Sequence, residues 1–288
     1  MNVAHAPEEL APGPRAITIG TFDGVHLGHR RVLDAVKATG LRSTVITFDP
    51  HPRTFRGNRV ELLASLERRL ELLANAGIDD TLVLTFDAEL AALSPEAFVD
   101  SFLRPIGAEV VAEGAGFRFG HQRAGNLELL AQLGFDARLV PLVDNISSSH
   151  IRRLLVAGDV TAAAAMLGRP AEVSGTVVLG DQRGGTLGFP TANLAVPPDL
   201  LVPQNGIYAG SALDHRVAVS IGTNPHYGGT ERRVEAYLLD YEGDLYGQPL
   251  VVELWERLRD EAVFDSEAAL VAAIASDVER TRAAVRPG

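Results

Sequence analysis

The stretch ITIGTFDGVHLGH, residues 17–29, guides the interpretation of the rest of the chain. Its first three residues are two isoleucines around a threonine, a pattern that predicts a buried strand ending where Gly20 allows the backbone to turn. A helical pattern follows, and we expect the helix to begin at Asp23 or Gly24. Strand, tight turn and helix in this order predict the first half of a βαβ unit.

Two histidines after this turn suit the binding of a phosphate. His26 and His29 are three residues apart, so on a helix their imidazoles would share one face. Free N–H groups at a helix start attract anions, and imidazole donors beside them would stabilise a phosphate that gains charge during a reaction. A zinc site is the alternative, but the chain has no cysteine and the histidine pair encloses no glutamate. The pattern favours phosphate over metal.

Length, composition and charge limit the class of protein. A chain of 288 residues, 46% of them hydrophobic, has enough apolar material for two packed domains. The net charge of −11 argues against nucleic acid as the main partner, because a polyanion needs a basic surface. A local cluster of histidine, arginine and backbone amides can still bind a phosphorylated small molecule.

The sequence carries no sign of export or of a membrane span. Its start contains prolines and glutamates, whereas a signal peptide has a basic segment followed by an apolar run. No stretch approaches the roughly 20 apolar residues of a membrane helix. We therefore expect a cytoplasmic protein with no membrane partner and a frayed start over residues 1–14. The sequence predicts no oligomeric state.

Strand and helix patterns alternate through the first half of the chain. Buried strands are predicted at residues 17–20, 43–48, 81–86 and 110–112, and helices at residues 28–38, at residues 62–76 and from Ser94 onward. Such alternation predicts an α/β fold with a doubly wound parallel sheet. His51 follows the second of these strands, at the edge where α/β folds bind ligands, although an ordinary turn explains it nearly as well.

The pattern changes after a predicted helix at residues 153–167. Short alternating runs with closely spaced turns predict a small antiparallel β-barrel followed by a helix at residues 266–285. The strands are expected at residues 172–179, 208–212, 217–221, 233–239 and 249–255. We therefore predict two domains, residues 1–168 and residues 169–288.

A second candidate site lies in GDQRGGTLGFPTAN, residues 180–193. Its glycines let the backbone approach a phosphate closely, Thr191 offers a hydroxyl of the kind that holds Mg²⁺, and Asn193 adds an amide oxygen. The stretch is not a Walker P-loop, because the GxxxxGK[ST] pattern is missing. From these residues alone, a loop-rich hairpin remains the alternative.

With these motifs the chain resembles the bacterial family of bifunctional riboflavin kinase/FAD synthetases. GTFDGVHLGH resembles the H-x-G-H signature of nucleotidyltransferases, and GTLGFPTAN resembles the signature of riboflavin kinases. The resemblance extends from about residue 17 to the last helix. It implies that the barrel makes FMN and ADP from riboflavin and ATP. It also implies that the α/β domain makes FAD and pyrophosphate from FMN and ATP, with Mg²⁺ assisting both steps.

The resemblance also implies roles for residues of the first domain. His26 and His29 would stabilise the ATP phosphates during catalysis. Other nucleotide contacts would come from Gly20, Phe22, Asp23, His51, Ser148, Ser149 and Arg152. The chain departs from the family at Gly116, where an aspartate or asparagine is usual. One alternative is therefore a kinase whose adenylyltransferase domain is weakened.

In the second domain, the resemblance makes Glu235 the general base that accepts the proton of the ribityl 5′-hydroxyl. Without the resemblance, Glu235 would be explained more simply as an exposed carboxylate on a strand. The resemblance also implies that Thr191 holds the metal ion. Further substrate contacts would come from Gly188, Pro190, Asn193 and Arg259. The remaining alternative, from another functional class, is a flavin-binding sensor that catalyses no reaction.

Overall fold

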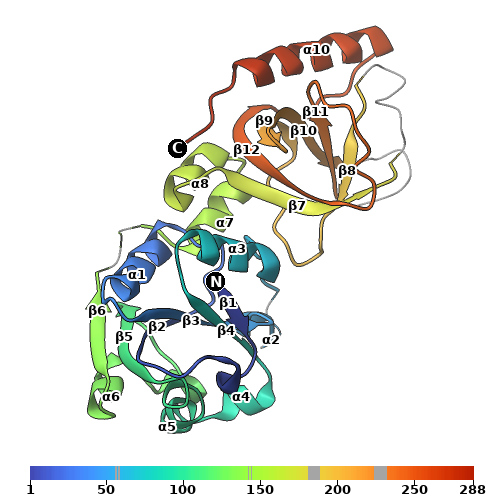
Figure 1. Ribbon diagram of the computed structural model, residues 1–288. Coiled ribbons are helices and arrows are strands. Elements are labelled where there is room, and N and C mark those ends of the chain that lie inside the picture. Colours follow the sequence, from blue (N-terminus) through green and yellow to red (C-terminus); the bar gives the residue numbers. More distant parts are fainter. Residues whose placement is uncertain (56, 58, 142, 144, 181–188, 224–231) are drawn as a thin grey trace. The chain divides into compact units, whose positions relative to one another are not determined.

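The computed structural model describes residues 1–55, 57, 59–141, 143, 145–180, 189–223 and 232–288. Its chain forms two compact units, residues 1–146 and residues 147–288 (Figure 1). Each unit is described by itself below. Among the described residues, no helix combines the length and the apolar character needed to cross a membrane.

The first unit is built on a six-stranded sheet in which every neighbouring pair of strands is parallel. The strand order is β1-β4-β3-β2-β5-β6. The strands are β1 (Asn2–Ala4), β2 (Arg15–Ile19), β3 (Arg42–Asp49), β4 (Asp80–Thr85), β5 (Ala108–Gly114) and β6 (Asp136–Val140). The predicted doubly wound parallel sheet is confirmed.

The order of the strands in this sheet bears on function. The chain builds outward from β2 to β3 on one side and later returns to β5 on the other, so the direction of winding reverses between β2 and β5. In such sheets ligands bind at this point, outside the carboxyl ends of the strands.

The expected frayed start is wrong, because β1 pairs with β4 at the edge of the sheet, with Asn2 opposite Asp80.

Helices cover both faces of this sheet (Figure 1). One face carries α1 (Leu27–Lys37) and α3 (Leu66–Asn75), and the other carries α4 (Ala88–Ala92), α5 (Pro95–Phe98), the π-helix η2 (Val99–Leu103) and α6 (Leu127–Gln132). Shorter helical turns are η1 (Pro7–Glu9), α2 (Pro52–Phe55) and η3 (His121–Arg123). Leu33, Val45 and Leu72 form part of the core on the first face, and Ile46, Leu82 and Leu103 form part of the core on the second. Burial of each such side chain contributes about 1.5–3 kcal/mol.

A buried ion pair ties three strands together at the amino end of the sheet, opposite the ligand-binding edge. The Asp80 carboxylate on β4 accepts hydrogen bonds from Arg15 on β2 and from Arg42 on β3. Arg15 and Asp80 are fully buried, and Arg15 also donates to the Ile106 carbonyl at 2.8 Å. Burial alone would raise the pKa of Asp80, but the hydrogen bonds from the two arginines outweigh it and hold the pKa below its ordinary value.

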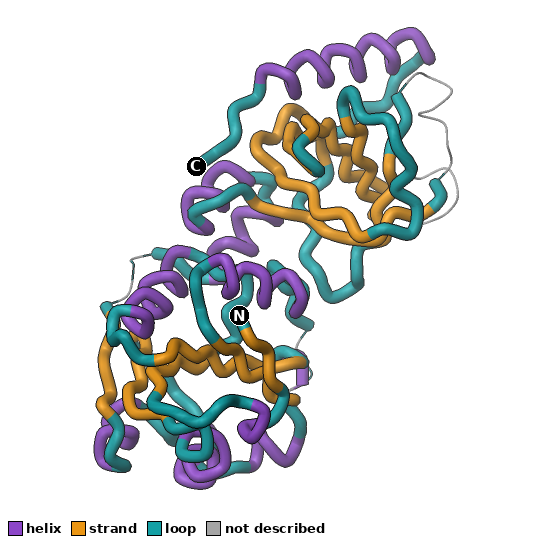
Figure 2. The backbone as a smooth tube through the Cα atoms, viewed as in Figure 1, coloured by secondary structure: helices purple, strands orange, loops and turns teal. Residues whose placement is uncertain are grey.

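The second unit is a closed barrel of strands (Figure 2). The strand order is β10-β11-β8-β7-β12-β9, with antiparallel pairing throughout. Its strands are β7 (Ala171–Val178), β8 (Ala192–Ala195), β9 (Gly206–Ala212), β10 (His215–Thr223), β11 (Arg232–Leu238) and β12 (Pro249–Arg259). The long helix α10 (Glu267–Ala283) follows the barrel. The predicted barrel and terminal helix are confirmed.

Two helices, α7 (Ser148–Val156) and α8 (Val160–Leu167), precede the barrel, so the single helix expected at residues 153–167 is wrong. The break falls at Gly158, whose φ of 79° lies in the left-handed region. A Cβ atom there would lie 2.8 Å from Cδ of Arg257, so only glycine fits without a shift. The Ala-rich sequence hides this interruption.

We predict that Asp80→Ala lowers the free energy of unfolding by about 3 to 5 kcal/mol, because it leaves the buried Arg15 guanidinium without its counter-ion. Urea unfolding followed by circular dichroism measures this change. Asp136→Ala is the control, because it removes the exposed Asp136–Arg138 pair from the same sheet and should cost much less. Equal losses in the two variants would contradict the role given to Asp80.

Candidate active sites

The turn after β2 has a strained backbone and ends at a histidine. Phe22 and Val25 have positive φ angles of 49° and 39°, and the Val25 N–H donates to the Phe22 carbonyl at 3.0 Å. A β-branched residue such as valine rarely adopts this conformation, and strain of this kind gathers at functional sites. Helix α1 begins at Leu27 with His26 as its N-cap, which agrees with the helix expected at residues 28–38, whereas an opening at Asp23 or Gly24 is wrong.

The two predicted histidines lie against each other at the start of α1. His26 Nδ1 accepts the backbone N–H of His29 at 3.2 Å, and the two rings stack with centroids 3.6 Å apart and planes 12° apart. Because Nδ1 of His26 is an acceptor, a neutral His26 carries its proton on Nε2. Phe22, another predicted site residue, places its ring 5.1 Å from that of His29.

Burial, and secondarily the neighbouring His26, lowers the pKa of His29 well below its ordinary 6.5. His29 is therefore a neutral imidazole at physiological pH. Its Nδ1 atom is buried and has no hydrogen-bond partner among the described residues. An unsatisfied buried nitrogen is uncommon in proteins, and at a helix start it is suited to a ligand oxygen.

Asp23 and Arg69 hold the loops beside this turn. The buried Asp23 carboxylate accepts the backbone N–H groups of Leu63 at 2.9 Å and Ala64 at 3.3 Å. Arg69, buried on α3, donates to the Thr21 carbonyl at 2.7 Å and to the Phe48 carbonyl at 3.3 Å. Arg69 thus connects the carboxyl ends of β2 and β3. The sequence analysis missed it, and a lone arginine within the apolar face of a helix was the available signal.

An aromatic cluster lies at the carboxyl ends of β3 and β4. The Phe86 ring makes edge contacts with Phe48 and Phe55, both at 5.6 Å between centroids, and Phe55 is 42% exposed. His51, the predicted contact in this region, is buried and its Nδ1 accepts the Arg53 N–H at 3.1 Å. The sequence analysis missed the aromatic cluster. Its signal is the repeated TFD at residues 47–49 and 85–87.

The other residues predicted to contact the nucleotide in the first domain lie on two segments. Gly20, just after β2, donates its N–H to the Ile46 carbonyl at 3.0 Å. Ser148, Ser149 and Arg152 belong to α7, at the start of the second unit.

Gly116, the departure from the family pattern, has a φ of 82° and open space where a Cβ would lie. Asparagine and aspartate are the side-chain-bearing residues that best tolerate such a φ. The usual family residue would therefore fit the backbone at this position, and its absence removes only a side chain.

In the barrel, the structure brings the central predicted residues together. The Thr191 hydroxyl donates to the Glu235 carboxylate at 3.4 Å, and Glu235 on β11 is the register partner of Asn193 on β8. A Cβ at Gly180 would lie 2.1 Å from the Asn193 amide nitrogen, so glycine allows this amide to lie against the backbone. The Thr191 hydroxyl and the Glu235 carboxylate are thus neighbours, and Asn193 lies opposite Glu235 on the paired strand.

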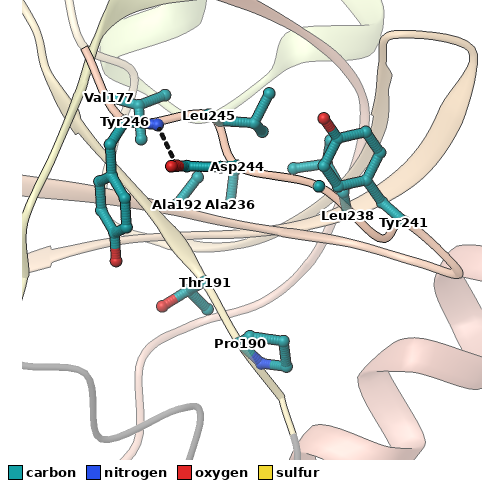
Figure 3. A pocket seen from close by; sticks show the side chains of 11 residues that line it. Val177, Pro190, Thr191, Ala192, Ala236, Leu238, Tyr241, Asp244, Leu245 and Tyr246 are labelled. Carbon is teal, nitrogen blue, oxygen red and sulfur yellow. Dashed lines mark hydrogen bonds between the residues drawn. The ribbon is translucent and has the colours of Figure 1, made fainter. Parts of the chain in front are cut away.

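A cavity of about 140 Å³ opens beside Thr191 (Figure 3), and neither Asn193 nor Glu235 belongs to its lining. Its lining combines the polar groups of Thr191 and Asp244 with aliphatic and tyrosine side chains. The lining residues are Val177, Pro190, Thr191, Ala192, Ala236, Leu238, Tyr241, Gly243, Asp244, Leu245 and Tyr246. Asp244 accepts the Tyr246 N–H at 2.9 Å, which holds this part of the wall in place.

The remaining residues predicted for the barrel site are Gly188 and Arg259. Gly188 lies outside the described residues. Arg259 donates to the buried Asp277 of α10 at 2.7 Å and to the Asp260 carbonyl at 2.9 Å, and its guanidinium lies 5.7 Å from the Phe264 ring centroid. Within the described part of the chain, no three His, Cys, Asp or Glu side chains are grouped so as to hold a metal ion.

Comparison with known proteins places both halves of the chain. The family model for FAD synthetase matches residues 9–151, and that for riboflavin kinase matches residues 167–285. A protein of Listeria monocytogenes called bifunctional riboflavin kinase/FMN adenylyltransferase is 35% identical, over 93% of this chain and 92% of its own length. A protein of the same name from Escherichia coli K12 is 34% identical, over 96% and 93% of the two chains.

The fold has also been seen in a solved structure. A crystal structure described as a macrolide-efflux protein from Streptococcus pneumoniae aligns with a TM-score of 0.85 and 27% sequence identity. The alignment covers 97% of this chain and 98% of that one, so it includes both units of this chain.

We predict that His29→Gln makes the stability of the first unit less dependent on pH. The lowered pKa of His29 means that the unfolded chain binds a proton near pH 6.5 that the folded protein does not bind until a lower pH. Stability should therefore fall as the pH drops below about 6.5, by up to about 1.4 kcal/mol per pH unit from this residue, and the variant should lose that slope.

Urea unfolding at several pH values between about 4.5 and 7 measures the slope. The substitution His5→Gln removes an exposed histidine from the same unit and serves as the control. Identical slopes in wild type and His29→Gln would show that His29 is not held neutral.

Proposed function

This chain belongs to the family of bifunctional riboflavin kinases and FMN adenylyltransferases, and from this premise we propose that its two reactions use two separate sites. The enzyme converts riboflavin and ATP into FMN and ADP, and FMN and ATP into FAD and pyrophosphate. We assign adenylyl transfer to residues 1–168 and phosphorylation to residues 169–288. The observation that carries the proposal is the Thr191 hydroxyl lying 3.4 Å from the Glu235 carboxylate beside a cavity.

In the kinase site, Glu235 acts as the general base. Its carboxylate accepts the proton of the ribityl 5′-hydroxyl as that oxygen attacks the γ-phosphorus of ATP and the bond to the ADP oxygen breaks. The neighbouring Thr191 hydroxyl orients the carboxylate. The aliphatic and tyrosine walls of the cavity suit a flat ring, and its polar end at Thr191 suits the phosphates.

The oxygen groups at this site fit Mg²⁺. Thr191 would hold the ion, with the Asn193 amide and Glu235 carboxylate close by. Magnesium usually binds through few protein oxygens together with substrate phosphates, which agrees with the lack of a carboxylate and histidine cluster among the described residues. When bound, the ion would neutralise phosphate charge.

In the adenylyltransferase site, His26 and His29 donate hydrogen bonds to the phosphates of ATP. A phosphate oxygen of FMN attacks the α-phosphorus, and the bond to pyrophosphate breaks. The two imidazoles stacked at the start of α1 and the positive end of its helix dipole support this role, because both oppose the negative charge of the transition state. Gly20 and Phe22 shape the turn, Asp23 and His51 hold its surroundings, and Ser148, Ser149 and Arg152 remain proposed nucleotide contacts.

We propose that the aromatic cluster of Phe48, Phe55 and Phe86 supports the isoalloxazine ring of FMN. A half-exposed phenylalanine at the ligand-binding edge of the sheet offers a flat apolar surface, and stacking of aromatic rings stabilises a complex by about 0.5–1.5 kcal/mol beyond area burial. In the barrel, Gly188, Pro190 and Arg259 remain proposed substrate contacts. The cytoplasm, where ATP is available for both reactions, is the proposed location.

We predict that Glu235→Gln lowers kcat of riboflavin phosphorylation by about 10²- to 10⁴-fold and leaves FAD formation from added FMN unchanged, because only the kinase loses its base. His26→Ala should do the reverse. Chromatography of the products made from riboflavin or from FMN with excess ATP measures both reactions. If Glu235→Gln kept full kinase activity, the proposed base would be wrong.

We predict that Phe55→Ala raises KM for FMN in adenylyl transfer by about tenfold, through loss of stacking and apolar contact, with little change in kcat. The kinase reaction should be unaffected. Leu139→Ala removes another exposed apolar side chain from the same unit and is the control. An unchanged KM in Phe55→Ala would place the flavin ring elsewhere.

A further inference from the structure

A buried glutamate lies where the winding of the sheet reverses. Glu113 is the second-to-last residue of β5 and is 4% exposed. Pairing between β2 and β5 ends at Ile17 and Val111, so the last residues of β2 lose their ladder partners on this side. The Glu113 side chain takes their place, since its Oε1 atom accepts the Ile19 N–H and the Thr18 hydroxyl, the latter at 3.1 Å.

This carboxyl has no cation to neutralise it. No Arg, Lys or His of the described residues forms an ion pair with Glu113. The charged and titratable groups of its own strand and of the elements packed on β5 are Glu109 of β5, Arg15 of β2, Asp136 and Arg138 of β6, His29, Arg30, Arg31, Asp34 and Lys37 of α1, and Glu128 of α6. The hydrogen-bond partners of Glu113 among the described residues are the Ile19 N–H and the Thr18 hydroxyl of β2.

The hydrogen bonds to this carboxyl all reach one of its oxygens. Both donors converge on Oε1, and Oε2 forms no hydrogen bond with the described residues. In the uncharged acid, Oε1 would be the carbonyl oxygen and Oε2 would carry the proton. Burial raises the pKa of Glu113 well above 4.5 and outweighs the two hydrogen bonds, which lower it.

We propose that Glu113 is a positioning residue for adenylyl transfer, which works as a neutral carboxylic acid that holds the end of β2 and the turn leading to His26 and His29. Ile19, which it binds, directly precedes Gly20, where the turn begins. The neutral form matters because ATP brings several negative charges to this edge of the sheet, and a buried carboxylate would repel them. Glu113 and His29 are then both uncharged before substrate binds.

The inference rests on the assignment of adenylyl transfer to residues 1–168. The experiments below distinguish a failure of the inference from a failure of that assignment. Glu113→Gln keeps the Oε1 acceptor and cannot ionise, so it imitates the neutral acid. At neutral pH this variant should keep kcat/KM for FAD formation within about threefold of wild type, whereas Glu113→Ala should lose about tenfold or more, because the Ile19 N–H loses its partner.

The pH profile of FAD formation is the second readout. As the pH rises, wild type should lose activity when Glu113 ionises, and Glu113→Gln should keep its activity to a higher pH. Glu109→Gln is the matched control, since Glu109 is an exposed glutamate of the same strand. Urea unfolding of each variant, followed by circular dichroism, reports whether the first unit is folded.

Infrared difference spectroscopy tests the proton directly and does not depend on activity. At neutral pH, wild type minus Glu113→Gln should show the C=O band of a protonated carboxyl group. A carboxylate band in its place overturns the proposal, as does a loss of FAD formation in Glu113→Gln as large as in Glu113→Ala. An unchanged activity and pH profile in Glu113→Ala would overturn the positioning role. If His26→Ala left FAD formation intact, the site assignment would fail while the infrared result for Glu113 stood.

Discussion

A parallel sheet whose winding reverses has to end its ladder at one place, and here that place is the carboxyl end of β2. Beyond Ile17 the main chain of β2 no longer pairs with β5, and side chains must satisfy the groups that remain. Glu113 does this for Ile19, while the Ile46 carbonyl accepts the Gly20 N–H on the other side. This constraint fixes the end of the strand, and the turn that carries both histidines starts from it.

In the proposed reactions, an acidic chain with a net charge of −11 would bind polyphosphates through local groups. In the first unit the groups are a helix start, two stacked imidazoles and an uncharged acid. In the barrel, antiparallel pairing of β8 with β11 sets Asn193 opposite Glu235 and brings Thr191 beside it. Each arrangement needs only short-range contacts, so neither requires a basic surface.

Much of this organisation could be predicted from the sequence, because hydrophobic periodicity reports the burial of strands and helices directly. The parallel sheet and the barrel agree with that prediction. The edge strand β1 was missed because three residues carry too little pattern, and the break at Gly158 was hidden in a run of good helix formers. The helix expected at residues 28–38 was found, but the opening suggested at Asp23 or Gly24 was wrong because histidine is an unusual N-cap.

The partners of Arg69 and Glu113 could not be predicted, since each joins segments that are distant in sequence and a charged residue is ordinarily expected at the surface.

The central claim is that one chain holds two sites that work independently. The most direct measurement is FAD formation from riboflavin and ATP in an equal mixture of the Glu235→Gln and His26→Ala proteins. Two independent sites predict that the mixture makes FAD while each variant alone does not. A mixture as inactive as its components would contradict them.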